Sequence, residues 1–251
     1  MNPTARLAVA LSVSGFVLAA TSAGPYAFAF SAMFAYAPML VAARSMPLWL
    51  ALPTALVPAA CGRALAFHGA FADDPTPALA VAALVPALLV DRFATTWAPR
   101  GAVLAWPCAL VVTERVVASS TAATLVPLPA LDAVLYPASD LGVAAGTFVA
   151  AVLCNGFAYV AGTLNRRFPD PYTQEEREAG VKLGAIGALV LAIALFAVAF
   201  ARGHFASPPS PSTSAGDVVV VLCALGVVAS LAAAVMRRSA RAKSAPAPSA
   251  V

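Results

Sequence analysis

Charge is what this sequence lacks most. Charged residues make up 10% of its 251 positions, whereas a soluble domain carries roughly 25%. Hydrophobic residues make up 61%, and the mean hydropathy is +0.87. Such a chain has too little polar surface to cover itself in water, so we expect the lipid bilayer to be its solvent. Because a helix satisfies its backbone groups within a single segment in lipid, the composition predicts an all-α, polytopic membrane protein.

Histidine and cysteine are scarce as well, and their placement excludes most site chemistry. His68 and His204 have no Cys or His at ligand spacing, so we predict no metal site. The four cysteines all lie inside apolar runs, at Cys61, Cys108, Cys154 and Cys223. They can pair only if helices juxtapose them, and we interpret them as small buried apolar residues. Cys108 and Cys154 have no adjacent base, which leaves no predicted catalytic residue and no predicted cofactor.

What the chain has instead is a series of long apolar runs. Crossing the hydrocarbon core of a bilayer takes about 20 apolar residues. The sequence offers eight candidate helices, at about residues 5–22, 27–43, 47–71, 77–95, 101–118, 141–162, 180–201 and 217–236. The second is short and could be tilted, merged with a neighbour or interfacial. Residues 1–236 therefore form the predicted transmembrane domain, and residues 237–251 a disordered, basic cytoplasmic tail.

The distribution of basic residues supports this count independently. With the N-terminus in the cytoplasm and the spans alternating, twelve basic residues fall on the inside and only Arg202 on the outside. The inside set is Arg6, Arg44, Arg92, Arg100, Arg166, Arg167, Arg177, Lys182, Arg237, Arg238, Arg241 and Lys243. This bias is what the positive-inside rule predicts for eight spans with both ends inside. A nucleic-acid partner is excluded, because no basic face with interleaved aromatic residues is present.

We single out three ionisable residues inside the predicted spans: Arg63, Glu114 and Arg115. Each costs at least about 2.5–3.5 kcal/mol to insert, so each is expected to face protein or water and to pair. Counted from the cytoplasmic start of its helix, Arg63 lies about 24 Å deep and Glu114 about 20 Å deep. Both are thus placed in the outer half of the membrane. They predict either a buried ion pair that locks two helices or a site for a lipid headgroup or anionic substrate.

The sixth predicted span carries a helix-packing signal. Gly142 and Gly146 are four positions apart, and such spacing of small residues permits close approach of two helices. Asn155 in the same span needs a polar partner, and an interhelical hydrogen bond is the simplest one.

Three stretches of the sequence occur in a recognisable order. VLAATSAGPYAFAFSAMFAYAPMLVAAR reads as an apolar helix, a turn and a second helix that ends at a basic residue. TERVV follows around Glu114, and then DLGVAAGTFVAAVLCNGFAYV with Gly142, Val143, Phe148 and Asn155. This order resembles the membrane domain of bacterial apolipoprotein N-acyltransferases. The resemblance implies eight spans with both termini in the cytoplasm, a location in the bacterial cytoplasmic (inner) membrane, and a role in lipoprotein N-acylation with a phospholipid as acyl donor.

The main departure from that family lies between the seventh and eighth helices. There the family has a nitrilase-like domain with a Glu-Lys-Cys triad, whereas this chain has HFASPPSPSTSAGD at residues 204–217. No catalytic residue can therefore be carried over. The resemblance then implies a module, non-catalytic alone, that binds membrane phospholipid, with a lipoprotein or a separately encoded nitrilase-like domain as further partners.

Two other functions stay open. One is a small multi-pass transporter, which would need a polar pathway through both leaflets; the placement of the ionisable residues in the outer half weighs against it. The other is a degenerate paralogue with a structural role only.

Overall fold

The computed structural model describes residues 3–22, 31, 34–66, 80–121, 142–164, 186, 190 and 214–244. These residues form seven α-helices and one short 3-10 helix, and no strand occurs among them. The helices are, in chain order, α1 (Pro3–Ser22), α3 (Ala37–Ser45), α4 (Leu48–Ala66), η1 (Ala80–Leu84), α6 (Val85–Trp97), α7 (Pro99–Thr121), α9 (Gly142–Leu164) and α11 (Ser214–Ser244). The predicted all-α class is confirmed for this part of the chain.

Three of the described helices are long and apolar enough to cross a membrane. They are Thr4–Ser22 in α1, Leu48–Ala66 in α4 and Gly216–Lys243 in α11. Two polar side chains of α1 are satisfied within the helix: Ser14 Oγ donates to Ala10 O at 2.8 Å, and Thr21 Oγ1 donates to Val17 O at 2.8 Å. Together the helices indicate a membrane protein. The count of eight spans stays a prediction, and the seventh predicted span, 180–201, lies outside the described residues except for Ile186 and Val190.

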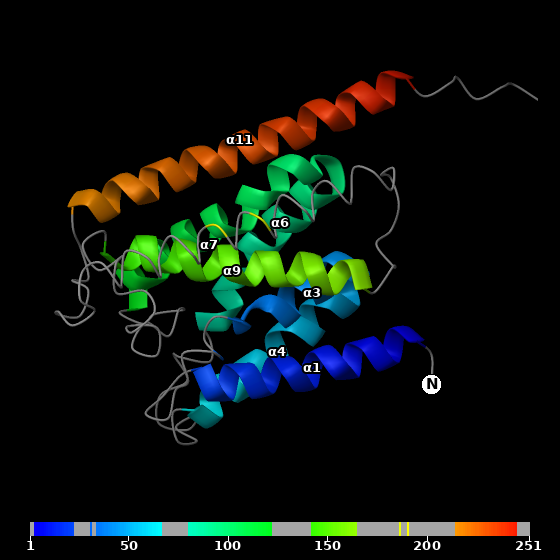
Figure 1. Ribbon diagram of the computed structural model, residues 1–251, viewed down its shortest axis with the longest axis vertical. Helices are drawn as coiled ribbons and strands as arrows, with labels where there is room; N and C mark the ends of the chain where they lie inside the picture. The colour runs from blue at the N-terminus through cyan, green and yellow to red at the C-terminus, as the bar shows by residue number, and fades with distance from the viewer. Residues whose placement is uncertain are drawn as a thin grey trace, which may run out of the picture.

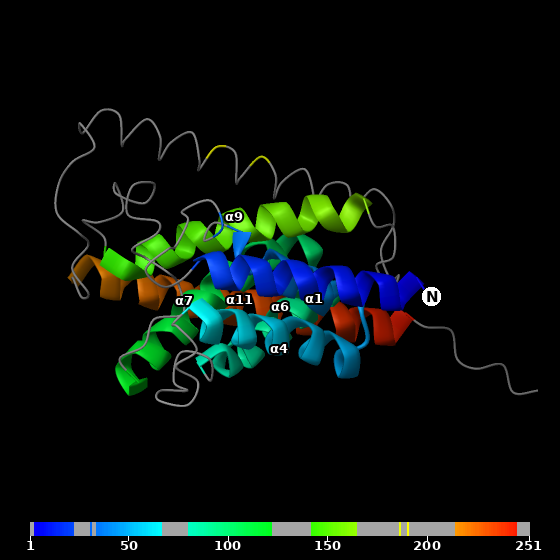
Figure 2. The ribbon, with the colours of Figure 1, turned by 90° about the horizontal axis from the view of Figure 1, so that it is seen from below.

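The long helices run roughly along one common axis (Figures 1 and 2). Figure 1 shows α1 and α4 together at one edge and α11 at the opposite edge, with α3, α6, α7 and α9 between them. α1 begins and α11 ends at the same end of the bundle in both views. We call this the basic end, because it carries the exposed side chains of Arg6, Arg237, Arg238, Arg241 and Lys243.

Two predicted spans contain helix starts that the sequence did not indicate. Within the predicted span 27–43, the nine-residue α3 begins at Ala37, after the turn residues Ala35 and Tyr36, with a proline in its first turn; residues 27–30, 32 and 33 lie outside the described part. In place of a helix over 77–95, η1 precedes the 13-residue α6, which also has a proline in its first turn. Proline suits the start of a helix because it lacks a backbone N–H, which at that position would have no hydrogen-bond partner within the helix. Apolar composition alone does not reveal such starts.

α11 ends later than predicted. The helix continues to Ser244 with Arg241 and Lys243 in its last turn, so the predicted disordered tail is corrected over residues 237–244. Alanine and arginine are good helix formers, and cations near a helix C-terminus interact favourably with its dipole. At the other end, Ser214–Asp217 of the polar segment form the first turn of α11; residues 204–213 lie outside the described part.

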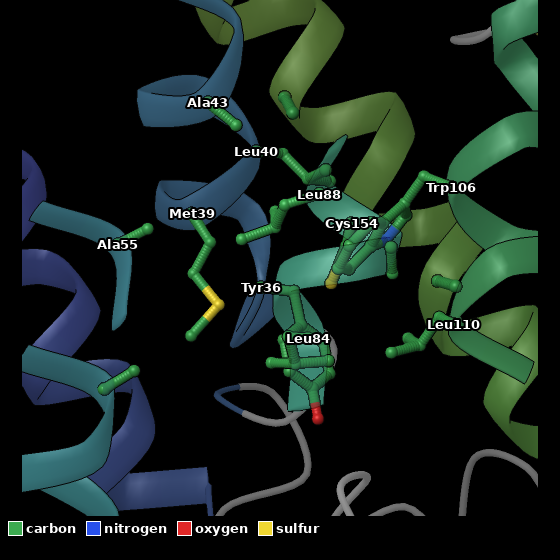
Figure 3. Close-up of a cluster of buried hydrophobic side chains, with 14 of the residues drawn as sticks. Tyr36, Met39, Leu40, Ala43, Ala55, Leu84, Leu88, Trp106, Leu110 and Cys154 are labelled. Carbon is green, nitrogen blue, oxygen red and sulfur yellow. The ribbon is translucent and has the colours of Figure 1, made fainter. Parts of the chain in front are cut away.

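The core lies where α3, α6, α7 and α9 meet (Figure 3). Its largest fully buried side chains include Trp106, Leu40, Met46, Leu84, Leu88 and Leu110. The rings of Tyr36 and Trp106 pack with centroids 6.0 Å apart. The short α3 is thus enclosed by protein, and its buried ends position the polar groups described next.

Candidate functional site

A buried polar network joins four helices near the basic end. Arg44, at the end of α3, donates through Nε to Asp91 Oδ2 at 2.8 Å and through Nη2 to Asp91 Oδ1 at 2.6 Å. The same Nη2 donates to Asn155 Oδ1 of α9 at 2.6 Å, and Asn155 Nδ2 donates to Val103 O of α7 at 2.8 Å. The side chains of Arg44 and Asp91 are only 1% and 0% exposed. We call these residues the inner network.

The neighbouring residue on α6 strengthens the same junction. Arg92 Nη1 donates to Ala43 O at 2.6 Å and to Met46 O, both at the C-terminal end of α3. A cation there satisfies carbonyl groups that have no partner within the helix and interacts favourably with the helix dipole. Asp91 therefore binds the Arg44 side chain of α3, and Arg92 binds backbone carbonyl groups at the C-terminal end of the same helix.

The polar groups of the inner network bind one another and are closed to solvent. The bidentate Arg44–Asp91 pair neutralises both charges and gives each carboxylate oxygen a donor. Asn155 uses its oxygen for Arg44 and its amide nitrogen for α7. A pair with so little exposure has no free face for an external ligand, so we assign the network to positioning α3, α6, α7 and α9.

Asp91 was not among the residues predicted to be functional. The signal was present in LLVDRFATTW, where a carboxylate interrupts an apolar run. Arg44 was counted as a cytoplasmic charge, but the structure buries it at 4% exposure. Asn155, which we expected to need a polar partner on another helix, makes its hydrogen bonds to α3 and α7.

A second polar group lies farther along the bundle. Arg63 of α4 and Glu114 of α7 are buried, at 8% and 2% exposure, and Tyr36, just before α3, is 4% exposed. The Arg63 side chain hydrogen-bonds the Tyr36 side chain, and Glu114 lies close enough to Tyr36 to interact with it electrostatically. The three side chains therefore lie near one another inside the bundle, on three different segments. We call them the outer cluster.

Arg115, the third ionisable residue singled out in the sequence, lies elsewhere. Its Nη2 donates to Asp217 Oδ1 of α11 at 3.0 Å, and the two side chains are 48% and 60% exposed. Successive residues on a helix point about 100° apart, so Glu114 faces the interior while Arg115 faces α11. An exposed ion pair of this kind contributes about 0–1 kcal/mol.

The two polar groups are well separated. Val103, which binds the inner network, and Glu114 of the outer cluster are 11 positions apart on α7. At 1.5 Å per residue this distance is about 16 Å along the helix. Buried ionisable residues thus occur at two levels of the bundle, because Asp91 is buried with Arg44 at some distance from Arg63 and Glu114.

Close helix contacts occur at glycines other than those singled out. A Cβ on Gly62 of α4 would lie 2.5 Å from Phe16 O of α1, and one on Gly226 of α11 would lie 2.7 Å from Cys108 Sγ of α7. Gly146 is buried in α9, and Gly142 is the first residue of that helix.

The described residues contain no group of three or more His, Cys, Asp or Glu side chains that could hold a metal. All four cysteines are free. Cys108 and Cys223 pack against each other between α7 and α11, and the Cys154 thiol lies against the backbone of Tyr36 and Ala37 at the start of α3. Both histidines lie outside the described residues.

Comparisons of the chain with protein-family models, curated proteins and solved structures found no match.

Proposed function

We propose that the chain is a multi-pass protein of the bacterial cytoplasmic membrane that binds a phospholipid headgroup inside its helical bundle and does not catalyse a reaction alone. The outer cluster of Tyr36, Arg63 and Glu114 carries this proposal. An ionisable residue within a membrane-embedded bundle is by default a candidate functional residue, because inserting it costs at least about 2.5–3.5 kcal/mol. The cluster gathers two such residues and a hydroxyl in one place.

Each residue of the outer cluster has a role that its chemistry suits. The Arg63 guanidinium is a planar, permanently charged donor for phosphate oxygens. The Tyr36 hydroxyl is a second polar contact, and the Glu114 carboxylate balances the charge of Arg63 when no ligand is bound. The resemblance of TERVV to the glutamate-bearing helix of apolipoprotein N-acyltransferases supports the same assignment. By that resemblance, a lipoprotein or a separately encoded nitrilase-like domain is the proposed further partner.

The proposed topology has eight spans with both termini in the cytoplasm. The common position of the start of α1 and the end of α11 at the basic end supports it. So does the position of Arg115 and Asp217, which pair where α7 ends and α11 begins, away from that end.

Lipid retention by the purified full-length chain tests the binding site. Native mass spectrometry from detergent micelles would count bound phospholipid in the wild type, in Arg63→Gln and in Arg115→Gln. We expect Arg63→Gln to weaken retention by about tenfold or more, because a hydrogen bond to a charged group contributes about 1.5–3 kcal/mol. Arg115→Gln is the matched control, since it removes one exposed guanidinium from α7 and should leave retention unchanged.

The competing interpretation is an ion pair that only locks α4 to α7. It predicts that Glu114→Ala lowers the yield of folded protein while phospholipid bound per folded chain stays constant. That result would contradict the binding proposal, whereas preserved yield with reduced binding would support it.

The absence of catalysis is tested separately. The purified chain would be incubated with a phospholipid and a diacylated lipoprotein peptide, and acyl transfer to the peptide amine would be followed by mass spectrometry. We expect no transfer, and measurable turnover would overturn the non-catalytic part of the proposal.

Transport is the second candidate, because buried polar residues occur at two levels of the bundle. Buried polar residues at two depths are what a polar pathway through both leaflets requires. Proteoliposomes loaded with a pH-sensitive dye would detect a proton pathway that depends on Asp91. Because Arg44 already occupies both oxygens of Asp91, we expect an imposed pH gradient to persist.

A further inference from the structure

α11 is longer than a bilayer requires. Its 31 residues extend about 46 Å, compared with about 30 Å for the hydrocarbon core. The uninterrupted apolar part, residues 218–236, accounts for about 28 Å of that length and matches the core. Residues 237–244, which we call the basic extension, therefore continue as helix beyond the hydrocarbon.

The basic extension is uniformly positive. Arg237, Arg238, Arg241 and Lys243 are all exposed, and residues 218–244 contain no acidic residue. At about 100° per residue, the three arginines lie within roughly one quadrant of the helix surface. Their neighbours are serine and alanine, which are too short to cover the guanidinium groups.

A contact with α6 holds the extension at a defined depth. The Arg238 guanidinium carbon lies 5.5 Å from the ring centroid of Trp97, the last residue of α6. This is a cation–π geometry, and tryptophan favours the interface between hydrocarbon and headgroups. A tryptophan at the membrane interface would place the first turn of the extension at the level of the headgroups.

We infer that the basic extension binds the anionic phospholipid headgroups of the leaflet in which α11 ends. The charges begin at the residue directly after the apolar part, and the whole extension reaches only about 12 Å farther. The headgroup layer of one leaflet is about 5–8 Å thick, so most of the extension lies in or beside it. A soluble polyanion would have to compete with lipid for side chains at this depth. The site is distinct from the outer cluster, which lies toward the opposite end of the bundle.

The test uses the full chain in nanodiscs of phosphatidylcholine alone or with about one quarter phosphatidylglycerol. A nitroxide is attached at Ser239→Cys in a Cys61→Ser background, because Cys61 is the exposed native cysteine. Power saturation then measures how accessible the label is to a water-soluble nickel complex. We expect phosphatidylglycerol to lower the accessibility by about threefold, and about 1 M NaCl to restore it by screening.

The variant R237Q/R238Q/R241Q/K243Q should remove the dependence on phosphatidylglycerol. Arg115→Gln, which removes a basic residue from the opposite end, should retain it. Equal accessibility in the two kinds of nanodisc would overturn the inference, and so would a difference that survives high salt or the fourfold substitution. The salt reversal needs only the labelled chain with its basic residues intact, so the test does not depend on the fourfold variant folding.

Discussion

Residues that look alike in the sequence have different environments in the structure. Arg44 and Asp91 form a nearly inaccessible bidentate pair, whereas Arg115 and Asp217 form a single, well-exposed contact. Removing one partner of a buried pair leaves a desolvated charge behind, while an exposed pair exchanges its partner for water. The two pairs therefore differ in energetic weight, although each joins an arginine to an aspartate on another helix.

The first prediction concerns the inner network. Asp91→Asn should lower the free energy of unfolding by about 3–5 kcal/mol, because Arg44 keeps its charge and loses its anionic partner in the core. Unfolding by dodecyl sulfate in mixed micelles, followed by circular dichroism, would measure the change.

Two variants control that prediction. Arg115→Gln should cost less than about 1 kcal/mol, since it breaks the exposed pair. The double substitution Arg44→Met/Asp91→Leu should recover most of the lost stability, because apolar residues of similar volume can replace a buried pair. A double variant as unstable as Asp91→Asn would contradict this account.

Part of the candidate site could be predicted from the sequence. The apolar runs around Arg63 and Glu114 indicate that both residues lie inside the helical bundle. The pairing of Asp91 with Arg44 could not be predicted, because it depends on α3 and α6 lying side by side. The apolar runs also could not show that Arg115 faces Asp217 of α11 rather than the outer cluster.

At the level of helices, close packing in the described part of the chain occurs at glycine. α1 and α4 pack so tightly at Gly62 that a methyl group there would overlap the backbone of α1. In lipid, helix association depends on such van der Waals contact, because lipid tails are as apolar as the helices themselves.

Gly62→Ala should therefore destabilise the fold by about 1–3 kcal/mol, since α1 and α4 must move apart to accept the new Cβ. The same unfolding titration would measure it.

Gly15→Ala on α1 is the matched control. Its Cβ would have Pro38 Cβ at 3.8 Å as its nearest neighbour, an ordinary contact. We expect this substitution to be neutral or slightly stabilising, because alanine is the better helix former. Equal changes in stability at both glycines would contradict the packing account, because helix propensity alone favours alanine at each position.

The long helices were predictable within a few residues, and the short ones were not. The predicted spans 101–118 and 141–162 correspond to α7 and α9, because sustained apolar composition is the signal of a helix in lipid. α3 begins at Ala37, directly after the turn residues Ala35 and Tyr36, and hydropathy alone does not mark that start. Neither glycine contact could be predicted from the sequence, since each depends on which helices are neighbours.

At the level of the whole molecule, the distribution of charge and the arrangement of the helices indicate the same orientation in the membrane. Of the six exposed basic residues in the described part of the chain, all but Arg115 lie where α1 begins and α11 ends. A bundle with one basic end is expected to be oriented with that end in the cytoplasm.

Reporter fusions would test this orientation. Green fluorescent protein fused to either terminus should fluoresce, and alkaline phosphatase inserted between residues 204 and 213 should be active, because it folds only outside the cytoplasm. A phosphatase that is inactive there, with a fluorescent fusion at the same site, would contradict the eight-span topology.

The inner network also has a consequence for how the protein is made. Arg44 leaves the ribosome 47 residues ahead of Asp91 and 111 residues ahead of Asn155. At about 5–20 residues per second, several seconds pass before α6 delivers the carboxylate. The Arg44 guanidinium of the nascent chain must therefore remain without its Asp91 counterion during this time. A chain that stops before residue 91 would be exposed to quality-control proteases.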